Sequence, residues 1–234
     1  MRYPSLLLPW LCCAVAAQSQ APQRQVQIPL ASPNDPVVIT RVLVGNVKVQ
    51  SGRFLKPRVR NAGQPQITPF EAGDDWIPNL SFYLLNRTTQ TVAAVHINIG
   101  FLDTATPTEP PRACVLQLGR IPEPAAFVNT GAVWPQPAGR LPLSFLPGQS
   151  MRIALADHLE EFRPFIEAVM PLAEVSSVRI DLTASYFPDG TRFAGGGYSA
   201  PDPDHHGRWR GKGVNYDPGF LPWAWPGEPG WPDP

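Results

Sequence analysis

The sequence predicts an all-β protein: a two-sheet sandwich with one short helical crossover, followed by an irregular Pro- and Trp-rich C-terminal tail. Proline supplies 30 of the 234 residues, and such an excess excludes long helices, because proline removes a helical hydrogen bond and clashes with the preceding turn. Several short segments of alternating polarity are separated by Gly, Pro and Asn turns. Only one segment has helical spacing. This pattern is typical of two packed sheets.

The N-terminus has the three parts of a signal peptide. Arg2 gives a positive start, residues 6–16 are apolar and uncharged, and residues 14–17 supply small side chains for cleavage. The apolar stretch is shorter than the roughly 20 residues that span a bilayer. We therefore assign residues 1–17 to a cleaved signal peptide and expect a secreted or periplasmic protein. An uncleaved anchor is the alternative. Charges or prolines interrupt every later apolar run, so no transmembrane segment is expected after cleavage.

Charge and cysteine content exclude two further classes. The formal net charge is zero and becomes slightly negative once Arg2 is removed, which argues against a nucleic-acid partner because such proteins present a basic face. Cleavage leaves Cys114 as the only cysteine. An internal disulfide is then impossible, so the protein is not a disulfide-stabilised scaffold.

Composition divides the mature chain into three parts. Residues 18–36 are polar and rich in Gln and Pro, and we interpret them as a linker with one short strand near residues 26–30. Residues 37–197 carry the β pattern and form the predicted sandwich domain. Residues 198–234 combine many prolines with four of the seven tryptophans and have no periodicity, so we interpret them as the irregular tail.

The first half of the domain contains the clearest strands. Residues 37–44 are rich in β-branched side chains, and a Gly45-Asn46 turn leads to a second short strand. Apolar side chains at every second position then mark residues 80–84 and 93–101. The turn at residues 86–90 predicts that these last two strands form a hairpin.

The second half of the domain continues the pattern. Residues 112–118 form a predicted strand with Cys114 on its apolar face, and residues 150–155 form another. Residues 157–172 have apolar side chains at helical spacing, and Pro164 is expected to kink or split this helix. Residues 178–187 alternate cleanly, and a Pro188-Asp189-Gly190 turn returns the chain as a hairpin.

Several turn motifs resemble those of a known class of domain. The segment Leu85–Val92 with its Asn86 turn, the strand ending in Phe101-Leu102-Asp103 and the Pro147-Gly148-Gln149-Ser150 turn resemble bacterial envelope domains of immunoglobulin or fibronectin type III shape. The terminal Tyr186–Thr191 hairpin is similar as well. The resemblance implies an immunoglobulin-like two-sheet sandwich. It departs at the predicted helix and in the Pro-rich loops, and its motifs carry no catalytic residue.

The tail tryptophans are the strongest candidate binding residues. A segment rich in Pro and Gly cannot bury tryptophans in a core of its own, so they pack on the sandwich, stack on a sugar or anchor a partner protein. They are Trp209, Trp223, Trp225 and Trp231.

The tail also contains a candidate metal site, formed by Asp202, Asp204, His205 and His206. Carboxylate and imidazole groups suit Zn, Cu or Ni. A solvated polar linker is the simpler interpretation, because adjacent histidines in an extended chain point to opposite sides.

Other chemically capable residues are interpreted as ordinary. His96 and His158 have no partner acid or nucleophile at local spacing, and Cys114 lies on an apolar face where a thiol behaves as a small hydrophobe. A short basic run keeps an edge strand solvated, or it contacts anionic lipid headgroups or a polyanion. It comprises Arg53, Lys56, Arg58 and Arg60.

These observations favour an exported, non-enzymatic binding or structural module of a bacterial envelope. The partner is an unknown protein or a glycan, and no cofactor is expected. The alternative is a carbohydrate-binding or hydrolase accessory domain that uses the tail aromatics. An enzyme would need acids clustered in a cleft, and the sequence brings no such cluster together. Its adjacent acidic pairs are Asp74 with Asp75 and Glu160 with Glu161.

Export predicts a shortened chain. Protein recovered from outside the cytoplasm should begin near Ala17 or Gln18, because the small residues at 14–17 suit signal peptidase. Intact-mass measurement checks this. Recovery of a chain that still begins at Met1 would contradict cleavage.

Overall fold

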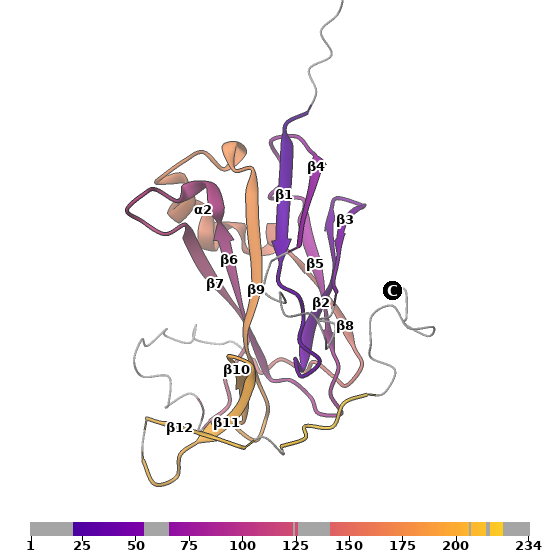
Figure 1. Ribbon diagram of the computed structural model, residues 1–234, viewed down its shortest axis with the longest axis vertical. Helices are drawn as coiled ribbons and strands as arrows, with labels where there is room; N and C mark the ends of the chain where they lie inside the picture. The colour runs from indigo at the N-terminus through magenta and orange to yellow at the C-terminus, as the bar shows by residue number, and fades with distance from the viewer. Residues whose placement is uncertain are drawn as a thin grey trace, which may run out of the picture.

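The computed structural model describes residues 21–53, 66–123, 125, 141–205, 207–213 and 216–221. Within these residues two sheets pack face to face, which confirms the predicted two-sheet sandwich (Figure 1). The described strands of the larger sheet are β1 (Gln23–Ile28), β4 (Gln66–Glu71), β6 (Ala94–Phe101), β7 (Arg112–Gly119), β9 (Ser177–Tyr186), β10 (Arg192–Ala194), β11 (Gly197–Pro201) and β12 (Trp209–Gly211). Those of the smaller sheet are β2 (Val37–Val44), β3 (Val47–Ser51), β5 (Leu80–Asn86) and β8 (Ser150–Ala154).

Strand β9 organises the larger sheet. Along one edge it pairs antiparallel with β6, and β6 in turn pairs with β7. Along its other edge, the start of β9 pairs with β1 in parallel and its end pairs with β10 antiparallel. Strand β4 extends the sheet beyond β1, and β11 and β12 extend it beyond β10. The smaller sheet has the order β3-β2-β5-β8.

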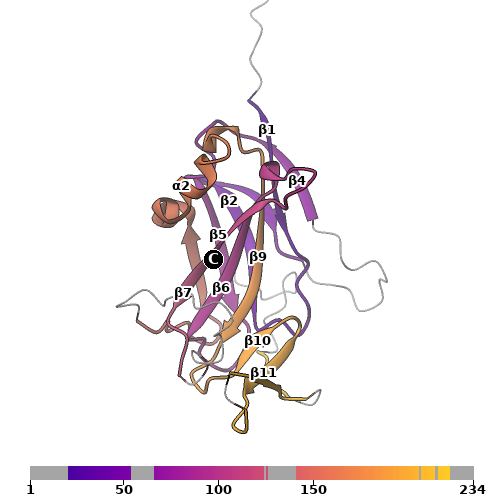
Figure 2. The same cartoon turned by 90° about the vertical axis from the view of Figure 1, so that its left-hand side faces the viewer.

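The predicted helical crossover is present. In the chain, helix α2 (Leu159–Glu167) connects β8 of the smaller sheet to β9 of the larger sheet. In space it lies at the end of the sandwich opposite β10–β12 (Figures 1 and 2). The described part of the chain also contains the 3₁₀ helices η1 (Leu102–Thr104), η2 (Leu155–His158) and η3 (Leu172–Glu174). Among the described residues, none of the helices has the length and apolarity that a membrane crossing requires.

Pro164 does not split helix α2 into two helices, which was one of the two outcomes expected from the sequence. It is exposed and lies inside the helix, which continues to Glu167. The missing N–H costs only the bond to the carbonyl of Glu160, and Glu160 lies on the exposed first turn, where water can hydrate that carbonyl.

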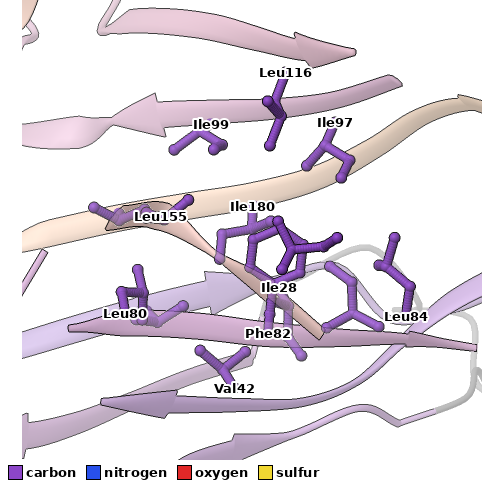
Figure 3. Packing of buried hydrophobic residues seen from close by; sticks show 14 of the residues in the cluster. Ile28, Val42, Leu80, Phe82, Leu84, Ile97, Ile99, Leu116, Leu155 and Ile180 are labelled. Atoms are coloured by element: carbon purple, nitrogen blue, oxygen red, sulfur yellow. The ribbon is translucent and has the colours of Figure 1, made fainter. Parts of the chain in front are cut away.

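The core lies between the sheets. Every second side chain of β6 is fully buried, as predicted for Val95, Ile97, Ile99 and Phe101. These side chains meet those of the smaller sheet and of β9 (Figure 3). The residues labelled there are Ile28, Val42, Leu80, Phe82, Leu84, Ile97, Ile99, Leu116, Leu155 and Ile180.

The predicted hairpin between residues 80–84 and 93–101 is wrong. β5 pairs with β2 and β8 in the smaller sheet, whereas β6 pairs with β7 and β9 in the larger one. The turn between them carries the chain from one sheet to the other. The Asn86 amide holds this crossing by donating to the carbonyls of Gln90 at 2.7 Å and Phe145 at 2.9 Å.

The prediction that residues 18–36 form a linker needs correction, because strand β1 lies within them. This strand pairs on both edges, and Val26 and Ile28 are 0% and 2% exposed. The buried Arg24 guanidinium donates to the carbonyls of Val175 at 2.8 Å and Ala173 at 2.9 Å. The sheet therefore begins before residue 37. The sequence underestimates the extent of this strand, because the charged Arg24 occupies one of its buried positions.

The irregular tail expected from residue 198 is also corrected. Strand β11 pairs with β10 and β12, so the larger sheet continues to Gly211. The described segment 216–221 packs against the domain as well, where the Leu221 amide donates to the carbonyl of Arg87 at 2.8 Å. Strands of three to five residues are too short to show the alternation that marks longer ones.

The burial of β1 predicts a stability difference between two isoleucines. Ile28→Ala removes a buried side chain and should lower the free energy of unfolding by about 2–5 kcal/mol. Ile67→Ala changes a 52% exposed side chain on the neighbouring strand β4 and should stay within about 0.5 kcal/mol. Chemical denaturation measures both. Equal effects would show that residues 23–28 do not belong to the core.

Candidate functional site

Residues of β10 and β11 line a hollow. These two strands lie at one end of the sandwich (Figure 1). The larger hollow, called here the aromatic cavity, has a volume of about 650 Å³. A smaller hollow of about 250 Å³ adjoins it and shares Phe193 and Gly196 as lining residues. The aromatic cavity is lined by Asn34, Phe193, Gly196, Gly197, Tyr198, Gly213, Tyr216, Asp217, Pro218 and Phe220.

The smaller hollow marks a gap in strand pairing. Strand β9 pairs with β1 as far as Arg179 and with β10 only from Ala184. Between them, residues 180–183 have no partner strand on that edge within the described chain. Because β1 ends at Ile28 and the chain crosses to the smaller sheet, this edge of β9 is left facing a hollow.

Four rings line the aromatic cavity: Phe193, Tyr198, Tyr216 and Phe220. The ring of Tyr198 lies centrally, with its centroid 4.8 Å from Phe193 and 4.8 Å from Tyr216. The cross-strand pair Phe193–Tyr198 comes from the tight β10–β11 hairpin. Gly195 and Gly196 turn this hairpin with φ of +59° and +82°, a conformation that favours glycine.

The Tyr198 hydroxyl has no hydrogen-bond partner among the described residues, although its oxygen is buried. Burial raises the pKa of Tyr198 well above its ordinary value, and Tyr216 and Asp35 act in the same direction. The hydroxyl is therefore neutral at physiological pH and can both donate and accept. A buried polar atom without a partner carries a free-energy cost that a suitable ligand would relieve.

Arg87 holds the segments around the cavity together. Its side chain is fully buried and donates to the backbone carbonyls of Pro33 at 3.2 Å and Asp35 at 3.0 Å. Its guanidinium carbon lies 5.3 Å from the ring centroid of Phe220, which lines the cavity. Burial lowers the pKa of Arg87 to about 10, and the nearby Asp35 charge opposes this shift. The guanidinium therefore stays charged at neutral pH.

The charged groups near the cavity are few. The Lys212 ammonium lies 4.5 Å from the ring centroid of Tyr216 and 3.5 Å from the Asp189 carboxylate. Asp217 is exposed, and its Oδ1 accepts a hydrogen bond from the Gly219 amide at 2.8 Å. The second carboxylate oxygen of Asp217 makes no hydrogen bond with another described residue.

Of the four candidate tryptophans, Trp209 lies in β12 and is half-buried. The Arg192 guanidinium stacks 3.9 Å from its ring centroid, and Trp209 packs against the buried cluster that contains Ala184 and Tyr186. Trp209 therefore docks on the sheet and does not line the cavity. Trp223, Trp225 and Trp231 lie outside the described residues.

Of the candidate metal ligands, Asp202, Asp204 and His205 belong to the described residues, and these three do not form a metal site. Asp202 accepts from the Asp204 amide at 3.0 Å and contacts His205 Nδ1 at 3.2 Å, which closes a local turn. Arg210 then pairs with Asp204 at 3.1 Å. Within the described residues no group of three or more potential ligands could hold a metal ion. His206 lies outside them.

The other chemically capable residues take structural positions. His96 is half-buried beside Tyr186 and Gln117, and burial lowers its pKa. His158 contacts Glu161 at 3.1 Å. The acidic pairs stay apart, since Asp74 pairs with Arg24 and Glu160 with Arg163 on helix α2. Arg53 is exposed, and Lys56, Arg58 and Arg60 lie outside the described residues.

Sequence reasoning missed Tyr198, Tyr216 and Phe220, because they were placed in an irregular tail. It also missed the role of Arg87, which it treated only as a turn residue. The available signal was local: the Gly195-Gly196-Gly197 run before Tyr198 indicates a tight turn that places an aromatic residue beside Phe193.

Comparison with known proteins finds no family model, no curated protein and no solved structure that matches the chain.

Cys114 lies on the core-facing side of β7 with Leu116, as the sequence predicted. It is half-buried, and its thiol points toward the Ile99 carbonyl at 3.8 Å. Burial raises the pKa of Cys114 from 9.0 to about 11. Little thiolate is then present at pH 8, and the thiolate is the reactive form.

This environment predicts slow alkylation of the native protein. Iodoacetamide at pH 8 should modify Cys114 about tenfold or more slowly in the native state than in denaturant, because unfolding restores an ordinary thiol pKa. Mass spectrometry follows the reaction. Equal rates in both states would mean that the core-facing and outward faces of β7 are exchanged by a one-residue slip.

Proposed function

We propose that the protein is an exported, non-enzymatic binding module of a bacterial envelope, and that the aromatic cavity is its binding site. The observation that carries this proposal is the unpartnered Tyr198 hydroxyl in a cavity lined by four rings. Ligand sites are concave, mostly apolar and supplied with a few polar groups, and their volumes are about 300–1,000 Å³. The aromatic cavity falls within this range of volumes and combines four rings with a few polar groups.

The residues lining the cavity support binding over catalysis. Acid–base chemistry needs a positioned proton donor and acceptor within reach of the same bond. Apart from the two tyrosines, Asp217 is the only ionisable side chain among the described lining residues. The pKa of Tyr198 is raised, so it is a poor base at neutral pH. We therefore assign these groups to recognition of a ligand.

The position of the cavity suits an exported module. Strand β1 begins at the end of the sandwich that carries α2, whereas the β10–β11 hairpin lies at the opposite end (Figures 1 and 2). A signal peptide or any attachment at the N-terminal side would thus leave the cavity open. The export itself rests on the signal-peptide pattern of residues 1–17.

The second candidate function is a carbohydrate-binding or hydrolase accessory domain that uses the tail tryptophans. The docking of Trp209 under Arg192 removes one of the four rings from that candidate. It now depends on Trp223, Trp225 and Trp231 alone. The aromatic cavity, by contrast, is built from residues that the sheet and the 216–221 segment already hold in place.

The proposed site predicts that filling the cavity abolishes binding without loss of stability. A Cβ at Gly197 meets no atom within 4 Å, and Gly197 has no positive φ, so Gly197→Leu is tolerated by the backbone. Gly211→Leu is the matched control: Gly211 is equally open and does not line the cavity. With an N-terminal tag, the native protein and Gly211→Leu should bind an envelope fraction of the producing bacterium.

In the same assay Gly197→Leu should bind at least about tenfold more weakly, because its side chain occupies the space of the ligand. Thermal melting of the three proteins serves as the control for folding. Undiminished binding by a folded Gly197→Leu variant would show that the aromatic cavity is not the site.

A further inference from the structure

We infer that the aromatic cavity binds an uncharged sugar ring of a glycan. This inference rests on the proposed binding function and names the ligand class. It follows from three properties of the cavity: the protein's own cations that already face two of the rings, the Tyr198 hydroxyl without a hydrogen-bond partner among the described residues, and the glycines that leave the backbone accessible.

A cationic ligand does not fit the cavity. Aromatic faces attract cations, but two of the four rings already face a cation of the protein. The Lys212 ammonium lies 4.5 Å from the centroid of Tyr216, and the Arg87 guanidinium carbon lies 5.3 Å from that of Phe220. A further cation between these rings would be repelled by both groups, since Arg87 is buried and poorly screened.

An anionic ligand does not fit either. Asp217 is the one carboxylate among the lining residues, and it is exposed at the cavity. The nearby cations are already used: Lys212 pairs with Asp189 at 3.5 Å, and Arg87 donates to backbone carbonyls. A uronate or phosphate would therefore face Asp217 without a free partner of its own. The charges favour a neutral ligand.

A purely apolar ligand would leave the polar groups unsatisfied. It would cover the Tyr198 hydroxyl without giving it a hydrogen bond, and such burial is costly. A sugar offers what the lining requires, because its C–H faces stack on rings while its hydroxyls donate and accept at the edge. Asn34 and Asp217 add an amide and a carboxylate that can bind further hydroxyls.

The cavity has room for more than one sugar ring. Its volume is about 650 Å³, and a second hollow of about 250 Å³ beside β9 shares Phe193 and Gly196 with it. Side-chain atoms that would otherwise fill this space are absent at Gly196, Gly197 and Gly213, where an added Cβ meets nothing within 4 Å. An oligosaccharide can therefore approach the backbone closely, and a trisaccharide is a suitable probe.

The test is calorimetric titration with three neutral trisaccharides: maltotriose, mannotriose and N,N′,N″-triacetylchitotriose. At least one should bind the native protein and the Gly211→Leu variant, and binding should be lost in Gly197→Leu. Tyr198→Phe keeps the ring and removes the hydroxyl, so it should weaken binding about tenfold, the effect of losing one hydrogen bond. Tetramethylammonium and trigalacturonate serve as the charged probes and should not bind.

Two outcomes overturn the inference: no neutral trisaccharide binds, or a charged probe binds in its place. If the envelope fraction is still bound by the native protein and not by Gly197→Leu, the binding function stands and the ligand belongs to another class, such as a protein. If Gly197→Leu binds the envelope fraction normally, the proposed function itself fails. The two assays therefore separate the two failures.

Discussion

The buried guanidinium of Arg87 is the interaction on which one end of the molecule depends. Burying a charge costs several kcal/mol unless polar partners surround it. Here the backbone carbonyls of Pro33 and Asp35 accept hydrogen bonds from Arg87 Nη1. The Arg87 amide also donates to the Pro36 carbonyl, and the Arg87 carbonyl accepts from the Leu221 amide. The connection between β1 and β2, the crossing between the sheets and the 216–221 segment therefore meet at one residue.

The aromatic cavity is a consequence of that junction. Leu221 is held on Arg87, so the preceding Phe220 and Tyr216 are brought opposite the β10–β11 hairpin. The hairpin contributes Phe193 and Tyr198 from a sheet formed independently of the junction. The rings thus come from segments far apart in the chain. Substitutions in the loops around such a site are tolerated only while the buried Arg87 guanidinium keeps its hydrogen-bond acceptors.

Strand β9 supplies the second structural condition for the site. Along one edge, β9 pairs first with β1 and then with β10, two strands from different parts of the chain. These two strands leave a gap between them on that edge. The four residues between them face a hollow that shares Phe193 and Gly196 with the aromatic cavity. Binding regions are commonly found where strand pairing changes partner, because backbone groups and space are both left available there.

The sequence by itself determined the local structure of most of the described chain: the strands of strong alternation, helix α2, the β9–β10 turn and the core-facing side of Cys114. Periodicity decides which face of a strand is apolar, so Ile97 and Ile99 could be placed in the core at once. Only the tertiary structure decided which strands pair. Periodicity carries no information about partners, so β5 and β6 look like a hairpin although they belong to different sheets. The candidate site escaped sequence reasoning for the same reason, since Tyr198, Tyr216 and Arg87 acquire their roles from contacts between distant segments.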